Sequence, residues 1–223
     1  MSDVSTLDSL LATKRQLDTR ISASPAAVRR LAELRRWQAA RLAQTYADLR
    51  HEPQCREAIE FFLSDVYGPQ DLTRRDAAFE RAWRPLKRAL PAAALKVLGD
   101  AIELEVLSAE LDQEMMARLA DGPVDRLTYE KAYRALGRVR QRRRQIDLVL
   151  SIGTDLTRLV DHPAIGLALR AARIPARLSG LDALQDFLER GYHAFRKMTD
   201  PQRLLSAIAE RETAFMNHLL DGV

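Results

Sequence analysis

Residues 91–120 read PAAALKVLGDAIELEVLSAELDQEMMARLA, and this stretch decides the fold because it carries two apolar stripes at helical spacing. The first stripe contains Leu95, Leu98, Ile102, Val106, Ala109 and Met116, and the second, on roughly the opposite side, contains Leu104, Leu107 and Leu111. A helix that is apolar on two sides must pack between neighbours on both of them. The segment therefore predicts the central helix of a bundle.

The same helical period covers almost every other segment, and no alternating strand pattern occurs. We therefore expect an all-α fold without a sheet, a multi-helix bundle of about eight or nine helices. The expected helices cover residues 4–21, 25–50, 53–67, 73–89, 91–120, 128–160, 163–173, 180–198 and 201–220. Capping residues precede prolines in the pairs Ser24-Pro25, His162-Pro163 and Asp200-Pro201. The short linkers favour antiparallel neighbours.

The domain organisation is expected to be simple. Residues 1–23 are expected to form an N-terminal helical appendage, and residues 24–223 a single helical-bundle domain. The first helix carries only a thin apolar stripe, formed by Leu7, Leu10, Leu11, Leu17 and Ile21. Such a helix can dock on the body, exchange onto a partner chain or fray, and the sequence leaves these alternatives open.

The composition excludes several classes of protein. Apolar residues make up 47% and charged residues 30% of the 223 residues, which excludes a disordered chain. Cys55 is the sole cysteine, so it forms no intramolecular disulfide, which fits a cytoplasmic location. The N-terminal residues contain Asp3 and Asp8 and do not resemble a signal peptide. No segment approaches the roughly 18 apolar residues of a membrane span.

A polar cluster interrupts the apolar residues between the third and fourth expected helices. Asp65 lies at the margin of an apolar helix face, Tyr67 lies near the helix end, and Arg74 and Arg75 lie in the first turn of the next helix. Because the helix dipole disfavours cations at that end, the two arginines need an anionic neighbour. Asp65, Asp71 or a bound anion would serve. The cluster therefore either ties down a loop or binds a ligand.

The segment that contains this cluster also carries a family resemblance. Residues 61–76 read FFLSDVYGPQDLTRRD, in which Gly68-Pro69 ends one helix and Thr73 begins another. This pattern resembles one found in a broad set of uncharacterised all-helical bacterial proteins of similar length. The downstream DFLERG at residues 186–191 is similar to part of the same pattern. The resemblance implies a helical fold and a bacterial cytoplasmic setting, and it implies no activity.

Several arginines lie on apolar helix stripes, where an unpaired charge would be costly. Arg35 shares a stripe with leucines of the second helix, and Arg140 and Arg143 extend a stripe that begins with tyrosines. We expect these arginines to meet carboxylates of the central helix, with Glu103, Glu105 and Glu110 as the candidates. Such a network either fixes the packing of the helices or lines a polar pocket.

Metal and nucleic-acid sites are not favoured. Glu103, Glu110 and Glu114 share a ridge of the central helix, but a di-iron bundle also needs Glu-x-x-His pairs, which the sequence lacks. The basic run over residues 131–144 could follow phosphates, but no aromatic or small polar residues interleave with it to read bases. The acidic segment 91–120 is an alternative partner for this run.

Three functions remain, in order of preference. The first is a non-enzymatic cytoplasmic binding or regulatory protein that acts through a helix face on an unknown protein partner, or on a second copy as a homodimer. The second is a bundle that binds a small apolar or anionic ligand in an internal pocket. The third is an enzyme that uses buried carboxylates. The candidate binding residues are Asp65, Tyr67, Arg74, Arg75, Arg35, Glu103, Arg140 and Arg143.

No catalytic residue, metal or cofactor is assigned. The sequence contains no nucleophile-elbow, phosphate-loop or dinucleotide motif. Cys55 lies on the inward face of its expected helix, where a thiol acts as a small hydrophobic side chain.

Overall fold

The computed structural model describes residues 4–66, 78–79, 81–83, 90–119 and 121–220, and every regular element in them is helical. The α-helices are α1 (Val4–Ser22), α2 (Pro25–Thr45), α3 (Arg56–Phe61), α5 (Ala92–Met116), α6 (Arg126–Leu136), α7 (Val139–Val160), α8 (Pro163–Leu178), α9 (Asp182–Arg196) and α10 (Pro201–Leu220). A short 3-10 turn, Leu49–His51, precedes α3, and a π-helical turn, Phe62–Val66, follows it. The expected all-α bundle is confirmed.

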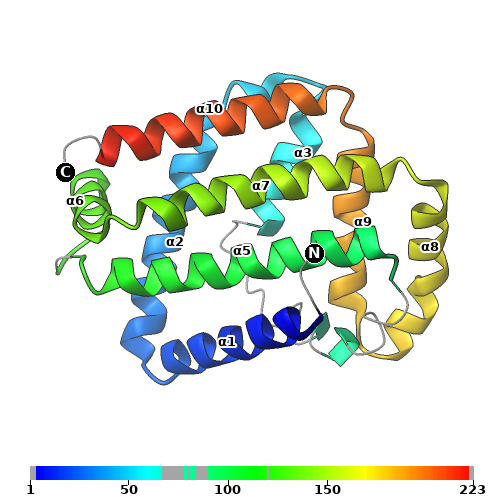
Figure 1. The fold of residues 1–223 in the computed structure, drawn as a ribbon, viewed down its shortest axis with the longest axis horizontal. Coiled ribbons are helices and arrows are strands. Elements are labelled where there is room, and N and C mark those ends of the chain that lie inside the picture. The colour runs from blue at the N-terminus through cyan, green and yellow to red at the C-terminus, as the bar shows by residue number, and fades with distance from the viewer. Residues whose placement is uncertain (1–3, 67–77, 80, 84–89, 120, 221–223) are drawn as a thin grey trace.

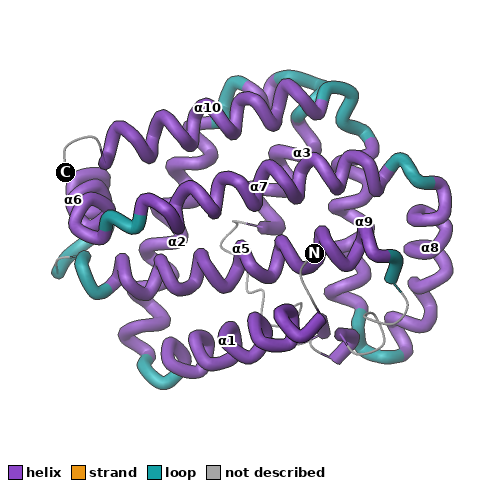
Figure 2. The backbone as a smooth tube through the Cα atoms, in the orientation of Figure 1, coloured by secondary structure: helices purple, strands orange, loops and turns teal. Residues whose placement is uncertain are grey.

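The helices form two layers that cross each other. In Figure 1, α10, α7, α5 and α1 lie side by side in one layer, while α2, α3 and α9 cross behind them. The same view drawn as a tube shows that short connections join most of these helices (Figure 2). Between α3 and α5, residues 67–77, 80 and 84–89 are not described. The helix α8 lies at the outer edge, where it packs on α9 and the end of α7.

The central position expected for residues 91–120 is confirmed in α5. One side of this helix places Ile102 and Val106 against α1, and the other side places Leu111 and Met115 in a core shared with α2, α6 and α10. Both of these cores are closely packed, because Met115 is fully buried and Ile102 is 5% exposed. The two apolar stripes of the sequence therefore correspond to two faces of burial, except that Met116, expected in the first stripe, packs against the second core.

The first helix docks on its own chain. Leu7, Leu11 and Leu17 are buried in a cluster with Trp83 and residues of α5. The indole nitrogen of Trp83 also donates a hydrogen bond of 2.7 Å to Asp8. Other segments of the same chain thus cover the thin apolar stripe of α1. The domain boundary expected at residue 23 stays a prediction.

The three expected caps before prolines are present. The side chains of Ser24, His162 and Asp200 each accept a hydrogen bond from a backbone N–H in the first turn of α2, α8 and α10, at 3.3, 3.3 and 3.0 Å. Each cap satisfies a donor that the start of the helix would otherwise leave unpaired.

The continuous helix expected over residues 128–160 is wrong. The chain breaks into α6 and α7 at Gly137 and Arg138, which both adopt positive φ angles, of 65° and 56°. Gly137 ends α6 because it takes this conformation without a Cβ clash. The helix α6 begins two residues earlier than expected, at Arg126, because Asp125 caps it and accepts a hydrogen bond of 2.8 Å from the Thr128 N–H.

Three other boundaries differ from expectation. The helix expected over 25–50 ends at Thr45, where the carbonyl accepts a hydrogen bond of 2.6 Å from Arg211 of α10 instead of continuing the helix. The helix expected over 53–67 is α-helical only in α3 before it widens into the π-turn. The helix α8 continues past residue 173 to Leu178. The helix expected over 73–89 falls largely outside the described residues.

Candidate functional site

The carboxylate of Asp65 is buried and paired. Its side chain is 9% exposed, and Oδ1 accepts hydrogen bonds or ion-pair contacts from Nε of Arg190 at 2.8 Å and from Nη2 at 2.5 Å. The hydroxyl of Ser64 donates to Oδ2 at 2.7 Å. The residues expected around it, Tyr67, Arg74 and Arg75, lie outside the described part of the chain. The pairing with Arg190 joins the two segments on which the family resemblance rests.

We expect Asp65→Ala to lower the free energy of unfolding by about 1–3 kcal/mol, because the change leaves polar partners of a buried carboxylate unpaired. Urea denaturation measures this difference. The matched control is Glu57→Ala, which removes an ion pair with Lys197 whose side chains are 65% and 43% exposed. That control should cost about 1 kcal/mol or less. Equal losses in the two variants would contradict a structural role for buried Asp65.

Arg35 meets a carboxylate of α5, but not one of those expected. Its Nε donates to Oδ2 of Asp112 at 3.1 Å, and Gln38 donates to Oδ1 of the same carboxylate at 3.0 Å. Asp112 is buried. Of the expected glutamates, Glu103 and Glu110 lie on the opposite face of α5, where Glu103 pairs with Arg144. Glu105 shares the face of Asp112, but it lies two turns away and pairs with Lys14 of α1.

The burial expected for Arg140 and Arg143 is wrong, since both are exposed. The expectation extended the tyrosine stripe of α6 through residue 137 as if the helix continued. The break at Gly137 and Arg138 changes the phase of α7 relative to α6, and it turns Arg142 inward instead. Arg142 is 8% exposed and lies with its guanidinium 4.4 Å from the ring centre of Tyr133.

The basic run of α7 pairs with the acidic ridge of α5. Arg138 binds Glu114 through two hydrogen bonds of 2.9 Å, and Arg144 binds Glu103 through bonds of 2.7 and 2.8 Å. The alternative in which segment 91–120 partners the arginines is therefore confirmed for these two. Carboxylates neutralise these guanidinium groups, which leaves less charge for phosphates.

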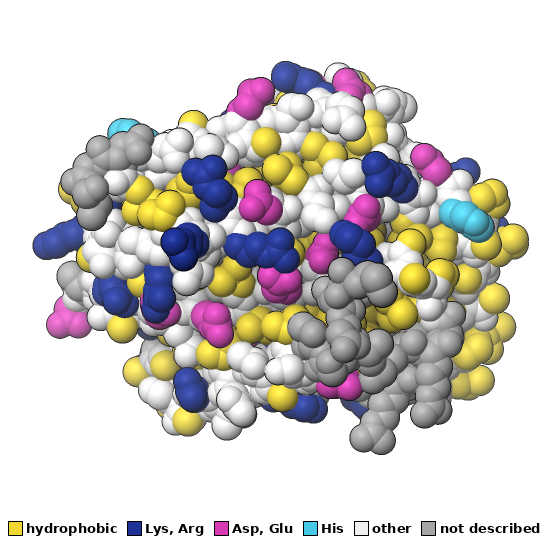
Figure 3. All heavy atoms as spheres, viewed as in Figure 1, with side chains coloured by type: hydrophobic (Ala, Val, Ile, Leu, Met, Phe, Trp, Pro, Cys, Tyr) yellow, Lys and Arg dark blue, Asp and Glu magenta, His cyan; other side chains and the backbone are white. Residues whose placement is uncertain are grey.

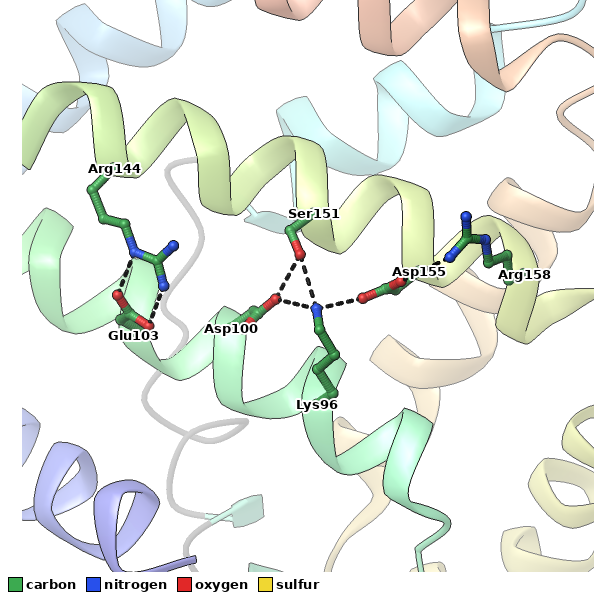
Figure 4. A network of polar contacts seen from close by, with 7 residues as sticks. All are labelled: Lys96, Asp100, Glu103, Arg144, Ser151, Asp155 and Arg158. Atoms are coloured by element: carbon green, nitrogen blue, oxygen red, sulfur yellow. Dashed lines mark hydrogen bonds and ion pairs between the residues drawn. The ribbon is translucent and has the colours of Figure 1, made fainter. Parts of the chain in front are cut away.

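A second network joins α5 to α7 further along the same seam (Figure 4). The ammonium of Lys96 lies 2.9 Å from Asp100, 3.0 Å from the Ser151 hydroxyl and 2.6 Å from Asp155. Ser151 in turn donates to Asp100 at 2.8 Å. The hydrogen bond to Asp155, followed by that to Asp100, raises the pKa of Lys96.

Ser151 and Lys96 lie as close together as the nucleophile and general base of a catalytic serine–lysine pair, but the protonation of Lys96 does not suit that role. A lysine that activates a hydroxyl must be neutral, and the neighbouring carboxylates favour the charged form of Lys96. The network therefore clasps two helices and does not form a nucleophilic site. Among the described residues, no group of three or more histidine, cysteine or acidic side chains is arranged to hold a metal ion.

The helix α8 exposes an apolar face. Its outward stripe follows the helical spacing i, i+4, i+7 and i+11 and consists of Leu167, Ala171, Ile174 and Leu178. The three large side chains are 61%, 72% and 84% exposed in chain order. Figure 3 shows hydrophobic atoms gathered along the right-hand edge of the molecule, where α8 lies in Figure 1. We call these four residues the α8 face.

Arginines border the α8 face on one side. Arg170 and Arg177 are exposed, and neither makes an ion pair with a described residue. On the other side the helix carries only alanines and Pro175. The proline is tolerated inside α8 because the carbonyl of Ala171, which loses its helical donor, belongs to an exposed residue. The sequence shows the spacing of the α8 face, but the helix expected there covers only residues 163–173. Two of the four residues of the face, Ile174 and Leu178, lie beyond that end.

A polar clasp fixes α8 on α9. Arg173 donates to the two carboxylate oxygens of Glu189 at 2.7 and 2.6 Å. Gln185 donates both to Glu189 and to the carbonyl of Leu169, each at 2.7 Å. The hydrogen bond from Arg173 lowers the pKa of Glu189 to about 2. The clasp therefore holds the α8 face outward at neutral pH.

We expect acid to release this clasp. Because the pKa of Glu189 is lower in the folded state than the ordinary 4.5, its contribution is complete above about pH 4.5 and is lost as the pH falls towards about 2. Hydrogen exchange over residues 163–178, corrected for intrinsic rates, should show faster opening at about pH 3, inside this window, than at about pH 6, above it. Glu189→Gln should show the faster opening already at pH 6. Identical protection in both proteins across this window would contradict the role of the clasp.

In the described residues, the fold and its surfaces define an all-helical bundle with apolar cores, ion pairs between helices and an exposed apolar face on α8. The chain belongs to the family described as a domain of unknown function (DUF8198), which matches residues 18–223. Membership of an uncharacterised family is thus confirmed, whereas the motif at residues 61–76 stays a prediction. No curated protein and no solved structure matches the chain. None of the helices in the described ranges is long and apolar enough to cross a membrane.

Proposed function

We propose that this protein is a non-enzymatic binding or regulatory protein of the cytoplasm that acts through the α8 face on a partner protein. The observation that carries the proposal is the exposure of Leu167, Ile174 and Leu178 along one side of a well-formed helix. Contiguous exposed apolar side chains on a soluble bundle mark interaction sites. The cytoplasmic setting is proposed from the single, buried cysteine, Cys55.

The charge beside the face indicates the chemistry of the partner. Arg170 and Arg177 leave a basic border with no carboxylate opposite it, and α8 itself contains no acidic residue. An apolar helix with a glutamate- or aspartate-rich flank would cover the leucines and pair the arginines together. The partner proposed is therefore an acidic amphipathic helix of another protein.

Two other occupants fit less well. A second copy of the chain would place the arginines of both α8 helices at one interface, and like charges there oppose association. A membrane surface would suit a basic helix, but the α8 face has no tryptophan or phenylalanine to enter the headgroup layer. Exchange of the first helix onto a partner chain, one of the alternatives left open by the sequence, loses support because α5 already covers the stripe of α1.

A pair of designed peptides tests the proposal. Each is a helix of about 18 residues with leucines along one face, flanked by glutamates in one peptide and by lysines in the other. Titration measured by fluorescence anisotropy should show that the glutamate peptide binds at least roughly 10-fold more tightly, and that added salt weakens it.

Equal affinity for the two peptides, or no binding of either, would overturn the proposal. Binding to vesicles of anionic lipid without binding to the glutamate peptide would assign the α8 face to a membrane surface instead. Sedimentation that shows a dimer in wild type, and a monomer after Ile174→Glu, would assign the face to a second copy. Each of these results counts against an acidic helical partner.

A further inference from the structure

Arg142 lies inside the bundle with part of its guanidinium group unused. The residue is 8% exposed, and its Nη1 donates a hydrogen bond of 3.1 Å to Gln145. Its Nε and Nη2 atoms are buried and have no acceptor among the described residues. Buried polar hydrogens are almost always paired in native proteins, so these two atoms need an explanation.

Other arginines of this chain bind carboxylates through Nε and Nη2, the two atoms that have no partner in Arg142. Nε and Nη2 together form a fork that matches two oxygens of a carboxylate or phosphate. Four arginines use this same pair of atoms on a glutamate, in the pairs Arg138–Glu114, Arg144–Glu103, Arg173–Glu189 and Arg203–Glu52. In Arg142 the same two atoms are buried and donate to no acceptor among the described residues.

The charge of Arg142 is also unmatched. No carboxylate of a described residue forms an ion pair with it, although a buried cation without a counter-ion is strongly unfavourable. Its neighbour Arg41 differs, because Glu212 neutralises that guanidinium group. A bound anion would supply the missing charge of Arg142.

The guanidinium group is held in place before any ligand arrives. The ring of Tyr133 lies against one face of the group, with its centre 4.4 Å away. Gln145, which binds Nη1, donates its own hydrogen bond of 2.8 Å to Ser108 of α5. These contacts fix the direction of the free fork, so binding requires little reorganisation.

A groove reaches the same seam between α5 and α7. It has a volume of about 330 Å³, and its lining includes Leu107, Leu111 and Glu114 of α5 together with Arg138 and Gln141. Arg138, the residue before α7, pairs with Glu114 of this lining, and Gln141 directly precedes Arg142 in the chain. The groove therefore reaches the turn beside Arg142, although the Arg142 side chain is not part of its lining.

We propose that the Nε and Nη2 edge of Arg142 binds the oxyanion group, carboxylate or phosphate, of a small ligand inside the bundle. The site is separate from the α8 face, and it does not depend on the proposed partner. Formate and inorganic phosphate are the smallest probes of the two oxyanion classes, and chloride at equal ionic strength reports the effect of salt alone.

Thermal unfolding tests the site. The midpoint of the wild-type protein should rise by about 3–6 °C for each tenfold increase in formate or phosphate above its dissociation constant, beyond the change caused by chloride. The probe that acts at the lower concentration identifies the oxyanion class. Arg142→Met should lose this response, whereas Arg140→Met, which removes an exposed arginine of the same helix, should keep it.

A second measurement applies if Arg142→Met does not fold. In the wild-type protein labelled with nitrogen-15, the Nε–H resonance of Arg142, assigned from its absence in Arg142→Lys, should shift saturably with formate or phosphate. A resonance that moves no more than it does in chloride would overturn the proposal. An equal thermal response in wild type and Arg142→Met would overturn it too, because the oxyanion would then bind elsewhere on the protein.

Discussion

Glu212→Gln is expected to lower the free energy of unfolding by about 2–4 kcal/mol. Glu212 accepts two hydrogen bonds of 2.8 Å from Arg41 of α2 and one of 2.8 Å from the hydroxyl of Tyr46. The side chains of Arg41 and Glu212 are 19% and 18% exposed, so the glutamine would leave a largely buried cation without its counter-ion. Denaturation with guanidinium chloride or urea measures the loss.

Electrostatics sharpen this expectation. Burial is the largest single effect and lowers the pKa of Arg41, but the charge of Glu212, its hydrogen bond and smaller contributions from two tyrosines together outweigh burial, so the pKa is raised. Burial, and then the charge of Glu212, raise the pKa of Tyr46, so the phenol keeps the proton that it donates. Arg41 therefore keeps its charge at neutral pH, and Glu212→Gln leaves this cation without its counter-ion.

The matched control is Glu103→Gln. It also removes the carboxylate from an interhelical arginine pair, but the side chains of Arg144 and Glu103 are 49% and 30% exposed. The loss there should be about 0.2–1 kcal/mol. If both variants lost the same amount, burial would not explain the strength of the Arg41–Glu212 pair.

The second large effect concerns the α8 face. The double substitution of Ile174 and Leu178 by glutamate should weaken binding of the glutamate-flanked peptide by about 30-fold or more, because both side chains would be apolar anchors of the interface. Since they are 72% and 84% exposed, the free energy of unfolding should change by about 0.5 kcal/mol or less for each substitution. Anisotropy and urea denaturation of the same samples separate the two effects.

Val28→Glu provides the control for exposed apolar residues in general. Val28 is 46% exposed on α2, away from α8. The peptide should bind this variant as it binds wild type. Equal weakening by Val28→Glu would show that the peptide responds to net charge and not to the α8 face, and it would contradict the proposed interface.

The sequence predicted those parts of the fold that depend on local chemistry. The two stripes of residues 91–120 can be read directly because helical spacing and burial coincide along a single helix. The caps at Ser24, His162 and Asp200 are equally local, since each acts within its own first turn. Such features do not depend on which helix packs where.

The polar partners were missed because they depend on packing between distant segments. Asp65 is joined to Arg190, 125 residues away, and no local pattern selects that arginine. The larger error was to expect one continuous helix across Gly137. The break there rotates α7 relative to α6, so Arg142 is buried and Arg140 and Arg143, which were expected to be buried, are exposed. A glycine followed by a charged residue at that point was the available signal.

A charge exchange on α8 tests whether this helix binds an acidic helix through its apolar face and its arginine border. Arg170 and Arg177 are replaced together by glutamate, and the glutamate- and lysine-flanked peptides are titrated into the variant and the wild type. We expect the variant to bind the glutamate peptide roughly 10-fold more weakly and the lysine peptide more tightly than wild type does. Unchanged affinities for both peptides would contradict the proposed interface.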